Sequence, residues 1–409
     1  MCYPVTIIFL NRGYVMAKKK DPYDDIEQSM DLQVFLESVV EGFNDVPDPR
    51  ESDNQSYPLM SLLLMILCAI IAGANSISGI HQYVRLKIGM FSKLLGASKA
   101  PSYTVFWWLL TRMEPEPLQA AFIKWASKLP ADVKAKFIAI DGKHLNGLVG
   151  GKGVHLVAAW ESSHGILLGQ VKAQEKSNEI TAIPELLDTI DINGANVTID
   201  AAGCQRGIAK KIREKGGDYT LALKGNQGTL HAEAKNFYSQ AREVGFADAN
   251  CKVSKTLDKG HGRIEEREVV VTNDLSWLDT RREWVDIKSM IEITSTRIVK
   301  GKESIETRYY ISSKEWSPEE AGLAIRSHWS IENHLHWNMD VIFREDDSLA
   351  NTGHAAENLA MFRRMALALI KEDVGGTVGI TRRRREAAWD DTYALRILGR
   401  LFKQDGKSF

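Results

Sequence analysis

The chain lacks the cysteine spacing of a zinc knuckle or of a disulfide framework. Its four cysteines stand at positions 2, 68, 204 and 251, and none of them forms a CxxC pair. This spacing argues against zinc ribbons and against small secreted folds that depend on disulfides. A reducing cytosol is therefore the expected compartment.

The chain also lacks an excess of charge of either sign. It carries 52 lysines and arginines against 53 aspartates and glutamates, a formal net charge of −1. A polyanion partner still needs only a local basic face. Two basic clusters are present: Arg206, Lys210, Lys211, Arg213 and Lys215, and the run from Arg382 to Arg385. Each is consistent with a solvated helix face or tail and also with phosphate binding.

No apolar run has the length of a membrane span. Residues 57–80 carry no charge, but only residues 59–72 are almost wholly apolar. A span needs about 20 such residues, whereas runs of about 10–14 are more often buried helices. We therefore predict a core helix and no membrane contact. The start of the chain fails as a signal peptide because its lysines follow the apolar patch VTIIFL. Met16 and Met30 are alternative starts.

A length of 409 residues predicts two or three domains. We expect residues 1–30 to be poorly ordered and residues 31–128 to form a helical domain. Its predicted helices lie in DLQVFLESVVEGF, residues 59–72, HQYVRLKIGMFSKLLG, TVFWWLLTRM and EPEPLQAAFIKWASKL. Residues 134–370 are predicted to form an α/β domain, and residues 371–409 a short basic tail.

Short apolar runs from residue 137 onward indicate a mixed sheet. FIAID, GVHLVAAWE, GILLGQVKA, VTID and YTLAL read as strands, with helices before and after VTID. The order β-β-β-α-β-α-β predicts a sheet with helices on both faces, in which the first and fourth strands are neighbours. Residues from about 250 to 313 read as a β-rich insertion, and helix resumes at Pro318.

Three acidic residues stand out against this framework. Asp141 and Asp200 each end an apolar strand, and Glu332 lies far downstream in HWSIENHLHW. Taken singly, each aspartate is also typical of a turn or a helix cap. Carboxylates held close together by three rigid elements are what a two-metal phosphodiester chemistry requires. Because the predicted strand order brings the two aspartates together, we interpret the three as one site.

The surroundings of Glu332 allow more than one interpretation. In an α-helix, His328, Glu332, His336 and Asp340 would share one slowly drifting face, since they are spaced by four residues. Such a stripe is compatible with zinc, although two helical turns separate the histidines. An amphipathic helix with solvated polar residues is the simpler alternative.

Two glycine-containing motifs are candidates for DNA contacts. Residues 223–228, LKGNQG, follow a strand, where Lys224, Asn226 and the backbone amides would meet a phosphate. An ordinary glycine turn explains this motif equally well. Residues 259–265, KGHGRIE, open the β-rich insertion and offer Arg263 to DNA. A solvated loop is the alternative there.

Several long motifs occur in an order that resembles a known family. They are DPR, YPLMSLLLMILCAIIAGA and PSYTVFWWLLTRMEPE in the helical part, and AIDGK, EKSNEI, VTIDAAGCQ, LKGNQ, GHGRIEER and HWSIENHLHWNMDVIFREDDS in the rest. From about residue 31 to 370 the chain resembles bacterial insertion-sequence transposases of the DDE class, in the H-repeat-associated (Rhs-linked) branch.

This resemblance implies a ribonuclease-H-like fold and a catalytic triad of Asp141, Asp200 and Glu332. The triad would bind two divalent cations, Mg²⁺ or Mn²⁺. It would cleave double-stranded DNA at inverted-repeat ends and transfer the freed 3′ end into target DNA, as a homodimer at the nucleoid. The rival hypotheses are a transposase-derived DNA-binding protein without catalysis and a general nuclease of the same fold.

The chain departs from the family pattern beside the glutamate. Related transposases carry an arginine four residues before this glutamate and a lysine seven residues after it, where this chain has His328 and Met339. Arg326 and Arg344 lie nearby in the sequence. The role of holding the DNA end is therefore expected to fall to Arg326, to Arg344 or to His328 itself.

Overall fold

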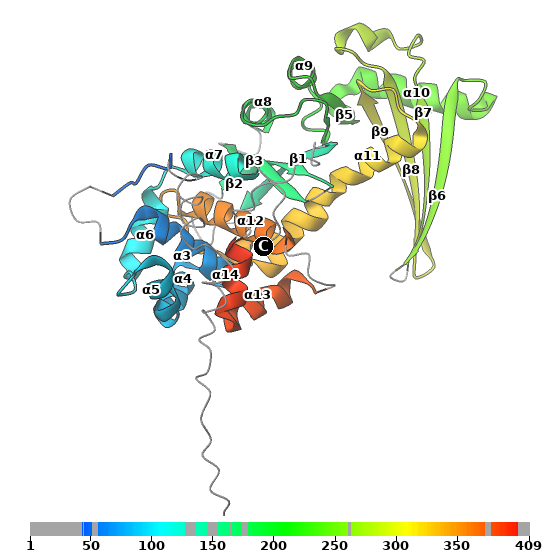
Figure 1. Ribbon diagram of the computed structural model, residues 1–409. Coiled ribbons are helices and arrows are strands. Elements are labelled where there is room, and N and C mark those ends of the chain that lie inside the picture. Colours follow the sequence, from blue (N-terminus) through cyan, green and yellow to red (C-terminus); the bar gives the residue numbers. More distant parts are fainter. Residues whose placement is uncertain are drawn as a thin grey trace, which may run out of the picture.

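The computed structural model describes residues 43, 45–50, 56–126, 136–145, 154–163, 165–173, 179–260, 263–372 and 378–399. The predictions for residues 1–30 and for the helix starting at residue 31 lie outside this part of the chain, except for residue 43. Figure 1 shows a group of helices beside a mixed sheet whose last four strands extend to one side.

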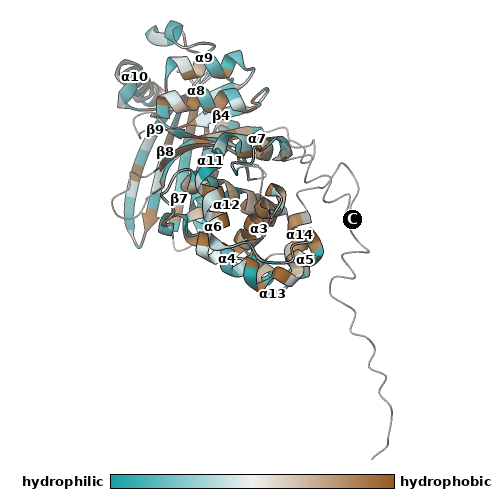
Figure 2. Cartoon of the chain, turned by 90° about the vertical axis from the view of Figure 1, so that its left-hand side faces the viewer, coloured by the Kyte–Doolittle hydropathy of each residue, from teal (hydrophilic) through white to brown (hydrophobic). Residues whose placement is uncertain are grey.

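Five helices within residues 56–126 precede the sheet. They are α3 (Leu59–Ile71), α4 (Ile77–Leu86), α5 (Ile88–Leu95), α6 (Tyr103–Arg112) and α7 (Pro115–Ala126). Every residue of α3 from Ser61 onward is buried, which confirms the predicted core helix. Figure 2 shows α3 as a strongly hydrophobic element inside the helical group. Within the described residues, no helix is long and apolar enough to cross a membrane.

In the residues that the structure describes, the sheet contains nine strands in the order β3-β2-β1-β4-β5-β9-β8-β7-β6. The strands are β1 (Phe137–Leu145), β2 (Val154–Glu161), β3 (Ile166–Ala173), β4 (Asn196–Ile199), β5 (Asp218–Leu223), β6 (Cys251–Gly260), β7 (Arg263–Thr272), β8 (Ser289–Val299) and β9 (Lys302–Ser312). The pairs β1–β4 and β4–β5 are parallel, and the other pairs are antiparallel. The predicted hairpin of β2 and β3 and the neighbouring positions of the first and fourth strands are thus confirmed.

Helices cover both faces of this sheet. In the described part of the chain, seven α-helices follow β3: α8 (Glu179–Thr189), α9 (Arg206–Glu214), α10 (Gly228–Val244), α11 (Pro318–Ser330), α12 (Ala355–Glu372), α13 (Ile380–Trp389) and α14 (Asp391–Gly399). In β1, Ile138 and Ile140 pack into the core with α8 and α9, whereas Ala139 belongs to the core around α3 and α12. Burial on both faces explains why these strands read as continuous apolar runs.

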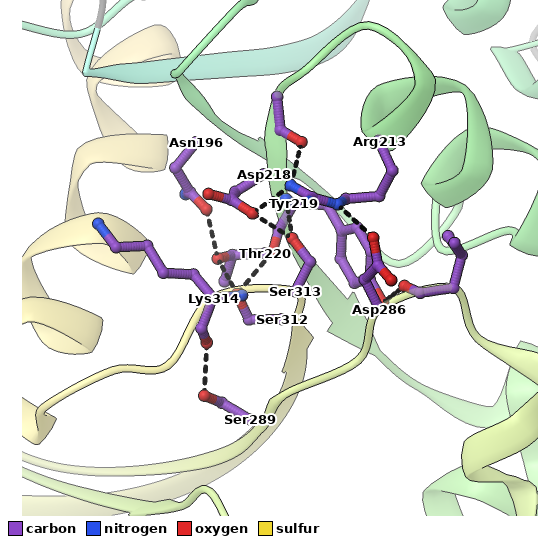
Figure 3. A network of polar contacts seen from close by, with 12 residues as sticks. Asn196, Arg213, Asp218, Tyr219, Thr220, Asp286, Ser289, Ser312, Ser313 and Lys314 are labelled. Atoms are coloured by element: carbon purple, nitrogen blue, oxygen red, sulfur yellow. Dashed lines mark hydrogen bonds and ion pairs between the residues drawn. The ribbon is translucent and has the colours of Figure 1, made fainter.

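The strands from residue 251 to 312 continue the central sheet, since β9 pairs with β5. Side-chain hydrogen bonds hold β5 and β9 together (Figure 3): the Ser312 hydroxyl donates to the Tyr219 carbonyl oxygen at 2.6 Å, and the hydroxyls of Thr220 and Ser312 lie 3.1 Å apart. Helix α11 packs on one face of the long strands, where Ala321, Ala324 and Ile325 contact β7, β8 and β9. The long strands and the segment that carries Glu332 are therefore held as one unit.

The basic clusters have partners within the protein. On α9, Arg206 pairs with Glu283, Lys211 with Asp188, and Arg213 with Asp218 and Asp286. Figure 3 shows Arg213 between its two aspartates. These pairs make α9 part of a network of surface ion pairs.

In the second cluster, two of the four arginines are buried. Arg383 donates to the Ile370 carbonyl oxygen at 2.8 Å, and Arg384 donates to the Ile70 carbonyl oxygen at 3.0 Å. The interpretation as a solvated tail is wrong for these two residues. They lie inside the helical core and satisfy backbone carbonyl groups of α3 and α12.

A single glycine permits the close approach of α6 to the start of α12. Gly353 has a φ of +53°, and a Cβ atom there would lie 2.2 Å from the carbonyl oxygen of Thr111. We expect Gly353→Ala to cost about 1–3 kcal/mol, because the strain and the backbone clash add up. Chemical denaturation would measure this loss. Gly89→Ala is the matched control, since no atom lies within 4 Å of its Cβ position. A loss equal in the two variants would contradict the prediction.

Candidate active site

The two aspartates lie at matched ends of neighbouring strands. Ile140 of β1 is paired directly with Ile199 of β4 in parallel register, so Asp141 and Asp200 each follow one member of this pair. Both isoleucines face the core of α8 and α9. Because side chains alternate along a strand, the aspartates belong to the opposite face, where α11 lies. The strand order predicted from the sequence is what places them there.

Asp141 occupies the more enclosed position. Its Oδ1 accepts a hydrogen bond from the Gly142 amide at 2.9 Å, and its Oδ2 lies 3.7 Å from Nδ1 of His336. Burial, followed by the negative charge of Asp200, raises the pKa of Asp141 to about 7, although the Gly142 amide acts in the opposite direction; Glu332 makes a smaller contribution that also raises it. The raised pKa therefore reflects burial of the carboxyl group first and the nearby negative charges second.

Asp200 forms the turn that follows β4. Its Oδ1 accepts hydrogen bonds from the amides of Ala202 at 3.0 Å and Gly203 at 3.3 Å. It is therefore a turn former, as an aspartate after a strand often is. The turn fixes the carboxylate at the strand end and keeps it exposed beside Asp141.

The segment with Glu332 is not a regular α-helix. Helix α11 ends at Ser330 and continues as two π-helical segments, Ile331–His336 and Asn338–Ile342. The expected α-helical stripe is thus wrong in its geometry, because π turns contain more residues than α turns. His336 and Asp340 nevertheless face β1, where they contact Asp141 and Lys143. Glu332 is exposed.

The described residues do not form a closed metal centre. No three histidine, cysteine, aspartate or glutamate side chains in this part of the chain lie close enough together to hold an ion. This holds for the zinc stripe and also for Asp141, Asp200 and Glu332. The donor chemistry of the three carboxylates nevertheless fits a hard divalent cation, which prefers oxygen ligands. A bound cation would neutralise the negative charges that act on Asp141.

Three residues near Asp141 were not singled out by the sequence. His155 Nε2 lies 2.6 Å from Oε1 of Glu179, the first residue of α8. A Cβ atom on Gly142 would approach these two side chains within 2.3 and 2.7 Å. This contact explains the glycine of AIDGK, Gly142, and the second glutamate of EKSNEI, Glu179. A glycine directly after a strand-end aspartate is the sequence signal that could have pointed to this close contact.

The candidate DNA contacts fall in different places. Lys224 is exposed, and Asn226 Nδ2 donates to the Ala201 carbonyl oxygen at 2.7 Å, which ties this loop to the turn after Asp200. Arg263 is exposed on β7. Arg326 is 62% exposed and lies 3.1 Å from Asp258 of β6. The structure therefore joins Asn226 to the turn that follows Asp200, whereas Arg263 and Arg326 are exposed on or beside the long strands.

His328 and Met339, which replace the basic residues of the family pattern, point inward. The His328 Nδ1 atom lies 3.1 Å from the hydroxyl of Thr198 on β4, and burial lowers the pKa of the imidazole. Met339 is fully buried. Arg344 has a positive φ of 51° and pairs with Asp347 at 2.6 Å. His328 thus fastens α11 to β4, which is a structural contact beside the site.

Comparison with known proteins shows the family to which the chain belongs. A family model described as "Transposase DDE domain" matches residues 133–369, and a model described as "DDE_Tnp_1-associated" matches residues 40–126. The chain belongs to the DDE-domain transposase family, which confirms the resemblance seen in its motifs.

Named relatives place it further within the H-repeat-associated group. "Putative transposase YncI" of Escherichia coli O157:H7 is 35% identical over 89% of this chain and 95% of its own length. "H repeat-associated putative transposase YhhI" of Escherichia coli K12 is 33% identical over 89% of this chain and 98% of its own length. A solved piggyBac transposase synaptic complex with hairpin DNA aligns at a TM-score of 0.41 with 10% identity, over 92% of this chain and 82% of that one.

Proposed function

We propose that this chain is a catalytically active DNA transposase, which cleaves DNA at the ends of an insertion sequence and joins the freed ends to target DNA. The observation that carries the proposal is the parallel pairing of Ile140 with Ile199, which sets Asp141 and Asp200 side by side. The Glu332 segment crosses the same face of the sheet, and its charge acts on Asp141. Family membership supports the same chemistry.

We propose that β1 to β5 form a ribonuclease-H-like core. The order β3-β2-β1-β4-β5 supports this, with an antiparallel three-stranded unit followed by two parallel additions. In such a sheet the aspartates of the first and fourth strands share one edge. The remaining four strands then form the β-rich insertion that precedes the glutamate.

Asp141, Asp200 and Glu332 would hold two divalent cations, Mg²⁺ or Mn²⁺. When bound, such cations activate a water nucleophile and stabilise the departing 3′ oxygen of a phosphodiester. The protein supplies orientation. The Gly142 amide fixes one oxygen of Asp141, and the amides after Asp200 fix one oxygen of that residue, so both carboxylates are aimed before substrate arrives.

Double-stranded DNA is the proposed partner, both as inverted-repeat ends and as target. Lys224 and Asn226 stand beside the Asp200 turn, where a phosphate next to the scissile bond would lie. Arg263 and Arg326 are exposed farther along the sheet and would contact DNA away from the cleavage point. We also propose a homodimer, because two element ends must be processed together, and action at the nucleoid in the bacterial cytoplasm.

The deciding experiment incubates the parent protein with Mg²⁺ and with DNA that carries the flanking inverted repeats of its own gene. Magnesium-dependent nicks at the repeat ends, followed by joining to a second duplex, are expected. Binding to repeat DNA without any metal-dependent product would show a protein that has lost catalysis. Cleavage without preference for the repeat ends would show a general nuclease. Either result contradicts the proposal.

A further inference from the structure

A buried lysine follows the first catalytic aspartate by two residues. Lys143 lies on the same face of β1 as Asp141, because side chains alternate along a strand. Its side chain is only 9% exposed. The ammonium group contacts the carboxylate of Asp340 and lies 3.4 Å from Oε2 of Glu345. Lys143 therefore joins the strand of Asp141 to the segment that carries Glu332.

Glu345 is the centre of this charge network. Its side chain is 1% exposed, and Arg364 of α12 donates to its carboxylate at 2.7 Å. Arg363 lies 3.9 Å away. Burial alone would raise the pKa of Glu345, but Arg364, Arg363 and Lys143 outweigh burial and hold the pKa at about 2. The carboxylate is thus ionised and shared among three cations from β1 and α12.

The network fixes the Glu332 segment at several points. His336 lies against Asp141, and Asp340 contacts Lys143. The Glu332 segment is therefore joined to β1 at two separate positions. Just beyond, the Arg384 guanidinium lies 4.1 Å from the ring centre of Phe343. The π-helical turns of residues 331–342 lie between α11 and this anchor. Such turns are rare and concentrate at functional sites.

A network of this kind is an expensive way to stabilise a core. Apolar residues of similar volume often stabilise a buried position as well as a buried ion pair does. A shift of the Glu332 segment by one residue, however, would separate these charged groups from their partners. The network therefore permits only one register of that segment. What the network supplies beyond stability is a fixed register of the Glu332 segment along β1.

We propose that Lys143 is a positioning residue, which sets the third carboxylate of the site against the first two through Asp340 and Glu345. The inference rests on the proposed metal-dependent function. Lys143 touches neither substrate nor cation, and it acts through the register of residues 331–342. It also gives a role to residues of two motifs, AIDGK and FREDDS, that the triad leaves unexplained.

The test maps the cation site with Fe²⁺ in place of Mg²⁺. Iron with ascorbate and peroxide generates hydroxyl radicals, which cut the backbone next to the bound ion. In the parent protein, cuts are expected near residues 141, 200 and 332. In Lys143→Met, the cuts near residues 141 and 200 should remain, and those near residue 332 should be lost. The Mg²⁺ concentration for half-maximal cleavage should rise by about 10–100-fold, as for other groups that orient metal ligands.

Matched variants separate positioning from general damage. Lys172→Met removes another lysine of the sheet, which pairs with Glu357 of α12 at 2.6 Å away from the Glu332 segment, and it should keep all three sets of cuts. Lys143→Arg should recover part of the cuts near residue 332. If Lys143→Met does not fold, Asp340→Asn decides, because its side chain is 37% exposed and breaks the same link.

The outcomes distinguish this inference from the function on which it rests. Unchanged cuts near residue 332 and unchanged Mg²⁺ dependence, in Lys143→Met or in its substitute Asp340→Asn, overturn the positioning role alone. A parent protein that gives no iron-dependent cuts overturns the proposed metal site and this inference with it. Loss of the cuts near residue 332 in both Lys143→Met and Lys172→Met also overturns it, since the effect would not be specific.

Discussion

Asp141→Asn is expected to lower DNA cleavage by at least about 10³-fold, because an amide cannot replace a carboxylate that binds a divalent cation. The same change should stabilise the metal-free protein by about 1–3 kcal/mol, because it removes a buried charge that Asp200 and Glu332 repel. The amide keeps the size of the side chain and still accepts the hydrogen bond from Gly142. A residue that serves the fold alone would show the opposite pattern.

The effect has a defined dependence on pH. The pKa of Asp141 is about 7 in the folded protein, against 3.8 for an ordinary aspartate. Stability associated with its protonated form is therefore fully present below about pH 4 and is lost as the pH rises through about 7. Asp141→Asn should lack this loss. Chemical denaturation in a chelating buffer at pH 5 and pH 8 would measure the difference.

Adding Mg²⁺ should reverse the order of stability. The parent gains stability when a cation binds its folded state, whereas the asparagine variant gains little. Asp188→Asn is a suitable control, because Asp188 is 63% exposed and pairs with Lys211 on the surface. It should leave cleavage unchanged and stability within about 0.5 kcal/mol. A variant at Asp141 that cuts DNA as fast as the parent would disprove the proposed mechanism.

The sequence revealed the aspartate pair because both signals are local. FIAI and VTI are short apolar runs buried on both faces, and each ends on an acidic residue. Parallel pairing of adjacent strands then converts two local signals into one place in space. No distant contact had to be known, and the structure reproduces the predicted strand order.

The Glu332 segment could not be predicted in the same way. Its apolar residues Ile331, Leu335 and Met339 are spaced as in an α-helix and are all buried. The π-helical turns arise where His336 and Asp340 meet β1, about 195 residues earlier in the chain. Periodicity within a segment carries no information on such partners.

Charge patterns misled for a related reason. A run of four arginines near the C-terminus is typical of a solvated surface, yet Arg383 and Arg384 are buried. Their acceptors are carbonyl oxygens at the ends of α3 and α12, at Ile70 and Ile370. Helix ends expose such groups, and only the packed structure shows which arginine reaches them.

The second large effect is expected at Glu345, where Glu345→Gln should destabilise the protein by about 3–5 kcal/mol. The change preserves shape but removes the only negative charge that Arg364 contacts at hydrogen-bond distance in the described residues. It leaves Lys143, Arg363 and Arg364 near one another in a site with little access to water. Urea denaturation followed by tryptophan fluorescence would measure the loss.

Acid should reveal the same interaction in the parent. Because the folded pKa of Glu345 is about 2 against an ordinary 4.5, its contribution is present above about pH 4.5 and is lost as the pH falls toward 2. Glu345→Gln should lose this part of the acid sensitivity. Asp347→Asn is the control in the same turn, since its pair with Arg344 is exposed and should contribute about 0–1 kcal/mol.

A double replacement distinguishes the two contributions of the network. Glu345→Leu combined with Arg364→Met substitutes apolar contacts for the central ion pair, and it should recover part of the stability lost in Glu345→Gln. Lys143 would keep Asp340, but the anchor to α12 would be gone. If the charges only held the fold together, cleavage would recover along with stability. If they set the register of the Glu332 segment, the protein would fold and still cut DNA poorly, because Glu332 would no longer be held against Asp141 and Asp200.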